Sequence, residues 1–232
     1  MAVAMIKQFT RFLPEAPDPA KAMRHFDQFL DQAAEGALPD RIISFLAGRE
    51  GMNMLAHVLG SSDFLWDEFL RIHFTDLLPV LENISKPKLL PAASGKESLR
   101  RELHVRLGQA STFQEKKKVL NRFKDGQVFL IDVKHLLEPQ VTLMEFSQAL
   151  TDLAEVVIDE AVTICYEHLG EKHGPFTICG LGKFGGREMG YASDLELLFV
   201  HDTLGSTPFF ESLARRVADF IEARNKGIFH ID

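Results

Sequence analysis

The pattern of apolar residues changes at His173-Gly174-Pro175, and this change constrains the fold of the chain more than any other sequence feature. Up to that point, apolar residues recur at the three- and four-residue spacing of amphipathic helices. Beyond it, short apolar, β-prone runs follow at 176–181 and 195–200, and a third begins at 228–232. A mostly helical region followed by a small sheet near the C-terminus predicts an α+β fold.

The sequence predicts three regions. Residues 1–97 form a helical region, and its last part, at about 83–97, is rich in proline and small polar residues and is expected to be a linker. Residues 98–174 form a second helical region. Residues 175–232 form a core built around the sheet.

Two long helices are expected in the middle of the chain. The first runs from about 99 to 123 and ends before a turn at Asp125-Gly126. The second begins after Thr142, because Thr142 and Glu145 have the spacing of a capping box. It ends at Gly170, which suits a helix C-cap.

Net charge and cysteine content exclude several classes of protein. The formal net charge is −7, so neither nucleic acid nor an anionic membrane is expected as a partner. The two cysteines, Cys165 and Cys179, have no metal-binding spacing and make no disulfide scaffold, so a cytoplasmic, reducing setting is expected. We expect no signal peptide, and no window approaches the ~20 apolar residues of a membrane span.

A glycine pair follows the first predicted strand. Gly185 and Gly186 permit backbone angles and close approaches that a Cβ atom would block. Successive N–H groups in such a turn can form a nest for phosphate oxygens. Taken alone, a Gly-Gly pair is more often a structural turn than a phosphate site.

Two carboxylates lie at the start of the second strand. Asp194 and Glu196 are two residues apart, so on a strand both face one side while Leu195 faces the other. Neighbouring carboxylates repel unless a cation offsets their charge, and Mg²⁺ commonly binds one or two carboxylates together with substrate phosphates. The structural alternative is a solvated strand end.

The run 197–200 is continuously apolar, which predicts a strand buried on both faces. Two acids at the start of such a strand, just after a Gly-Gly turn, are hard to explain as ordinary solvent-exposed side chains. Together these features favour a site for phosphate and a metal ion.

The same stretch resembles a known motif. GKFGGREM at 182–189 and YASDLELLF at 191–199 are similar to the pattern G-K-x-G-G-x-E-L-x-x-x-S-D-x-D-L-x-F. That is the nucleotidyltransferase motif of the glutamine synthetase adenylyltransferases. Shorter segments also resemble the N-terminal catalytic half of this family, and they lie at 59–65, 120–124, 129–133, 150–154 and 227–232.

The resemblance implies a role for each candidate residue. Its metal-binding and catalytic carboxylates are Asp194, Glu196 and Asp232. Its nucleotide- and phosphate-binding residues are Gly185, Gly186, Ser193, Lys183 and Arg187. For Ser193 the alternative is a structural role, in which it braces the start of the strand. For Lys183 and Arg187 the alternative is a surface salt bridge.

The resemblance also implies a fold and a function. The fold is a nucleotidyltransferase-type small mixed sheet with flanking helices. The function is adenylylation of glutamine synthetase or phosphorolytic removal of its AMP, with Mg²⁺ or Mn²⁺ as cofactor and ATP or ADP as the nucleotide. Glutamine synthetase is then the protein substrate, and a nitrogen-signalling regulatory protein is a second partner. The alternative is a catalytically weakened module of the same fold, kept for regulation or protein binding.

Two features depart from the family pattern. Glu196 stands where the family has Asp, so the carboxylate is one methylene farther from the backbone. The sequence ends at Asp232, before the Arg-rich continuation of the family. This predicts a fragment, a truncated form or an unusually short homologue, with an incomplete core and weak or no transferase activity.

Overall fold

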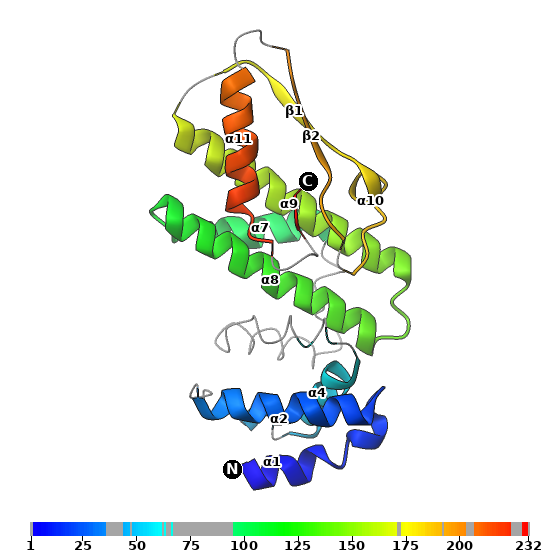
Figure 1. Ribbon diagram of the computed structural model, residues 1–232. Helices are drawn as coiled ribbons and strands as arrows, with labels where there is room; N and C mark the ends of the chain where they lie inside the picture. Colours follow the sequence, from blue (N-terminus) through cyan, green and yellow to red (C-terminus); the bar gives the residue numbers. More distant parts are fainter. Residues whose placement is uncertain are drawn as a thin grey trace. The chain divides into compact units, whose positions relative to one another are not determined.

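The computed structural model describes residues 2–35, 44–46, 48–61, 63, 66, 95–170, 173–191, 193–202, 207–223 and 229–231. These residues are mostly helical, with a small antiparallel sheet near the C-terminus (Figure 1), so the predicted α+β class is confirmed. The chain divides into two compact units, residues 1–90 with 129–141, and residues 91–128 with 142–232. Most of the predicted linker at 83–97 lies outside the described residues.

The first unit is helical. Its elements are α1 (Ala2–Phe9), a short 3₁₀ turn (Leu13–Glu15), α2 (Pro19–Glu35) and α4 (Arg49–Ser61). The Asp18 carboxylate accepts the Lys21 N–H at 2.9 Å and caps α2, and this bond lowers the pKa of Asp18. In the core the Phe9 and Phe26 rings stack 3.8 Å apart, and Phe129 is fully buried against the same cluster.

The sequence predicted one helix over 99–123, but these residues belong to two helices. Helix α7 (Gly95–Leu107) ends early, and α8 (Phe113–Leu137) begins after a break. The break has a cap: the Glu115 carboxylate accepts the N–H groups of Ser111 and Thr112 at 2.8 and 3.0 Å, which lowers its pKa.

The predicted turn at Asp125-Gly126 was wrong, because α8 runs straight through it. A glycine inside a helix costs only about 1 kcal/mol relative to alanine. Burial of the neighbouring side chains outweighs that cost, and Phe123, Val128 and Phe129 are each at most 2% exposed.

The longest helix, α9 (Leu143–Leu169), has both predicted ends. Thr142 and Glu145 form the full capping box, and Gly170 closes the helix with φ at 71°, in the left-handed region. Helix α9 packs against α7 and against α11 (Thr207–Phe220), and it forms the centre of the second unit's core.

The sheet consists of β1 (Phe176–Gly180) and β2 (Leu197–His201), paired antiparallel with Ile178 opposite Phe199. On one face, the Phe176 ring contacts Phe210 of α11. On the other face Leu198 and Val200 are 49% and 44% exposed. The prediction of a strand buried on both faces was therefore wrong, because the described helices cover only one face of the sheet. No described helix is long and apolar enough to cross a membrane.

The capping box predicts a specific stability change. Replacing Thr142 by Ala removes the hydroxyl that accepts the Glu145 N–H, so we expect the free energy of unfolding to fall by about 1 kcal/mol. Urea denaturation measures this change. Thr163→Ala is the matched control, because that hydroxyl only bonds the Asp159 carbonyl within α9. Equal losses in the two variants would contradict the capping role.

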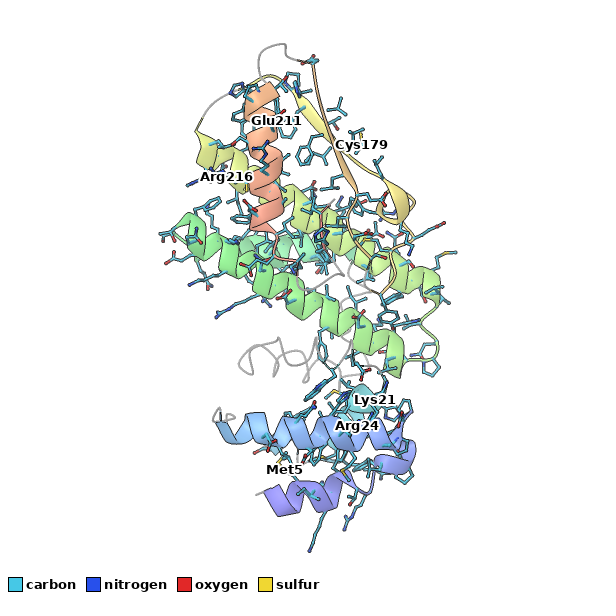
Figure 2. All side chains as sticks on the ribbon, viewed as in Figure 1. Met5, Lys21, Arg24, Cys179, Glu211 and Arg216 are labelled. Atoms are coloured by element: carbon cyan, nitrogen blue, oxygen red, sulfur yellow. The ribbon has the colours of Figure 1, made fainter. Side chains whose placement is uncertain are left out.

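The two cysteines should differ sharply in reactivity. Burial raises the pKa of the Cys165 thiol to about 12, whereas Cys179 is exposed on β1 (Figure 2). Only a thiolate attacks Ellman's reagent, so at pH 8 we expect Cys179 to react in the folded chain and Cys165 only after unfolding in guanidinium chloride. The Cys179→Ser variant should then show no fast phase. A fast phase in that variant would show that Cys165 is accessible.

Candidate functional site

The segment Asp194-Leu195-Glu196 is held from both sides. Leu195 is fully buried, and the acids on either side of it are exposed. The Leu195 N–H donates to the His230 carbonyl at 2.6 Å, and Leu195 forms a parallel bridge with Ile231. The Glu196 carbonyl accepts the Leu181 N–H at 2.8 Å. The exposed–buried–exposed alternation presents both carboxylates away from the core, as the two-residue spacing predicts.

Gly182 lies directly against the Glu196 carboxylate. Its φ is 50°, and a Cβ atom built on it would lie 2.4 Å from Glu196 Oε2. Only glycine both adopts this left-handed conformation at little cost and leaves room for the carboxylate. Sequence reasoning did not select Gly182, although its position as the first glycine of the motif is a usable signal.

The glycine pair ends a short helical turn, α10 (Gly182–Gly185). A Cβ atom on Gly185 would lie 2.3 Å from the Gly180 carbonyl oxygen, so this glycine allows the turn to pack closely on β1. The N–H groups of Gly185 and Gly186 donate to the carbonyls of Leu181 and Gly182 at 2.8 and 3.0 Å. Both amides therefore already have partners, and phosphate binding by this pair stays a prediction.

Arg187 and Lys183 are both basic, but they have different surroundings. Arg187 has φ at 59°, and its guanidinium donates to Asp152, Glu155 and Gln148 of α9. The structure thus shows a salt bridge for Arg187, and phosphate binding by its guanidinium stays a prediction. Lys183 is exposed and has no ionic partner among the described residues, so its ammonium is available to a phosphate.

Ser193 closes the turn before the acidic segment. It is 4% exposed, and its hydroxyl accepts the Gly190 N–H at 2.9 Å. Its carbonyl accepts the Phe229 N–H at 3.3 Å. These contacts brace the backbone that leads into Asp194, and contact between Ser193 and a nucleotide stays a prediction.

The structure describes two of the three predicted metal ligands. Asp194 and Glu196 offer carboxylate oxygens, which are the ligands that Mg²⁺ prefers. Asp232 lies outside the described residues. Within the described part of the chain, no three His, Cys, Asp or Glu side chains converge closely enough to hold a metal ion. The donor chemistry of the visible pair fits a divalent cation, and the third ligand stays a prediction.

A groove of about 610 Å³ runs beside the glycine turn, between α9 and β1. Its lining includes Gly180, Gly185 and Arg187, but neither Asp194 nor Glu196. This groove therefore does not include the acidic pair.

Comparison with known proteins gives one consistent answer. The model of the glutamate-ammonia ligase adenylyltransferase family matches residues 52–229. A bifunctional glutamine synthetase adenylyltransferase/adenylyl-removing enzyme of a Bradyrhizobium species is 28% identical over 207 residues, which cover 84% of this chain and 20% of that protein. The enzyme of the same name from Nitrosomonas europaea is 33% identical over 119 residues, which cover 49% of this chain and 13% of that protein.

The enzyme of that name from Acinetobacter baylyi is 28% identical over 177 residues, which cover 69% of this chain and 18% of that protein. The chain thus spans a fifth or less of the length of these three relatives. The family match covers more than half of the chain and includes the glycine turn, both visible carboxylates and Phe229. This chain belongs to the glutamate-ammonia ligase adenylyltransferase family.

Proposed function

We propose that this chain handles an adenylyl group on glutamine synthetase, with a divalent cation held by Asp194 and Glu196. The observation that carries the proposal is the segment 194–196, where a buried leucine presents two carboxylates to solvent inside the region that matches the family. The relatives are named for adding the adenylyl group and for removing it.

The cation would be Mg²⁺ or Mn²⁺. When bound, it neutralises phosphate charge and orients the phosphate oxygens. Asp194 and Glu196 would hold it, with Asp232 as the expected third ligand. Lys183 lies within the glycine turn and is the residue that we expect to contact a phosphate there. ATP or ADP is the expected nucleotide, because transfer of the adenylyl group from ATP to the protein releases pyrophosphate, and its transfer from the protein to phosphate forms ADP.

Glu196 favours one alternative. Its carboxylate rests against Gly182, and its side chain is one methylene longer than that of the Asp in the family motif. Mg²⁺ demands near-ideal geometry, so a displaced ligand weakens catalysis before it weakens protein contacts. A regulatory module that binds glutamine synthetase without transferring AMP is therefore the second candidate.

Metal-dependent nucleotide binding tests the proposal. We expect calorimetry to show ATP binding in Mn²⁺ that is lost in EDTA and at least about tenfold weaker in Asp194→Asn, because the phosphates need the bridging cation. Asp219→Asn, at an exposed acid on α11, is the matched control and should bind like the wild type. Equal binding in EDTA would reject the metal site and leave the regulatory module.

The contact between Gly182 and Glu196 gives a second test. In Gly182→Ala the new methyl group would lie 2.4 Å from Glu196 Oε2, so the carboxylate must shift, and the left-handed φ adds strain. We expect Mn²⁺ affinity to fall at least about tenfold. Gly190→Ala is the control, because a Cβ atom there meets no atom within 4 Å. Unchanged affinity in Gly182→Ala would remove Glu196 from the metal site.

A further inference from the structure

A lysine is buried inside the second unit. Lys124 of α8 is only 3% exposed. Its ammonium lies 2.7 Å from Asp125 Oδ1 and donates to the Glu222 carbonyl at 2.8 Å. A buried charge is costly unless it is paired and hydrogen-bonded, so the packing around Lys124 is specific to an ammonium group.

Asn121 lies one turn earlier on α8 and contacts the same end of α11. Its side-chain oxygen accepts the Glu222 N–H at 2.8 Å, and its amide donates to the Phe220 carbonyl at 2.9 Å. The last carbonyls of a helix lack partners within the helix and carry partial negative charge. Asn121 and Lys124 therefore cap the C-terminal end of α11 from the side of α8, as the two helices lie in Figure 1.

The same ammonium faces the segment that supports the acids. Lys124 Nζ lies 5.4 Å from the centre of the Phe229 ring, within the range of a cation–π contact. Phe229 is fully buried and has φ at 70°, which is unfavourable for a bulky residue. Its N–H donates to the Ser193 carbonyl, and the next carbonyl, of His230, accepts the Leu195 N–H.

We propose that Lys124 is a positioning residue for the acidic segment. It keeps the Phe229 ring buried and its backbone left-handed, so that residues 229–231 stay hydrogen-bonded beside 193–195 and aim Asp194 and Glu196 outward. Asn121 supports it by fixing the end of α11. Lys124 itself contacts no nucleotide. Its importance for metal binding rests on the proposed function, whereas its effect on the backbone does not.

Amide hydrogen exchange tests the effect on the backbone. In Lys124→Met we expect the Leu195 and Phe229 amides to exchange about tenfold faster, while Val157 and Ile158 in the middle of α9 keep their protection. Lys118→Met is the matched control, because it removes the same charge from an exposed position of α8. The control should leave all four amides unchanged.

A second variant covers the case in which Lys124→Met does not fold. Phe229→Leu keeps an apolar side chain but loses the aromatic ring, so it should reproduce the local effect if Lys124→Met folds poorly. A uniform acceleration in both variants, or unchanged exchange at Leu195, would overturn the positioning role.

Mn²⁺ titration of the same variants separates this inference from the proposed function. If both hold, Lys124→Met binds Mn²⁺ about tenfold more weakly than Lys118→Met. If Asp194→Asn binds Mn²⁺ as well as the wild type, the metal site fails, whatever Lys124→Met does to exchange. If Asp194→Asn loses binding but Lys124→Met does not, the proposed function stands and the positioning role of Lys124 is overturned.

Discussion

The buried side chain of Leu195 is the contact on which the site depends. It is fully enclosed, so the residues before and after it must face outward, and both are acids. Hydrogen bonds from Leu195 to His230 and from Leu181 to Glu196 then fix the backbone from two directions. A short segment with one apolar anchor and a bond on each side can hold exposed charges in place without a long strand.

Ion pairs along α9 tie the site to the helices. Glu155 is shared between Lys96 of α7, at 2.7 Å, and Arg187 at the end of the glycine turn. Arg100 of α7 pairs with Asp159, one turn farther along α9. Partly exposed pairs contribute little singly, but a network with a shared acid restrains the orientation of each member. The acidic face of α9 thus holds both α7 and the glycine turn.

Local chemistry in the sequence predicted much of this structure. Alternation around Leu195, the capping box at Thr142 and the helix end at Gly170 depend on neighbouring residues, and all three are present. The break between α7 and α8 was missed although its capping residues, Thr112 and Glu115, are neighbours in the sequence. The exposed face of β2 was missed because it depends on which distant surfaces pack together.

The candidate site also combines features that are local in the sequence with features that depend on distant contacts. The acids and the motif were visible in the sequence. The fit of Gly182 against Glu196 and the burial of Lys124 were not, since each requires contact between residues far apart in the chain or on separate elements. Lys124 lies in a helix rich in basic residues, so the sequence alone suggests a solvent-exposed side chain. Its burial depends on the segment that follows α11, whose Glu222 carbonyl accepts its ammonium.

The left-handed backbone at Arg187 and Phe229 has a consequence for the stability of the candidate site. Neither residue is glycine, so each favours other backbone angles until its side chain is secured, Arg187 by α9 and Phe229 by Lys124 of α8. The two bends are therefore stable only when α9 and α8 are in place, and the acidic segment between the bends depends on both helices. A change that loosens either helix would therefore disturb the backbone of the candidate site as well.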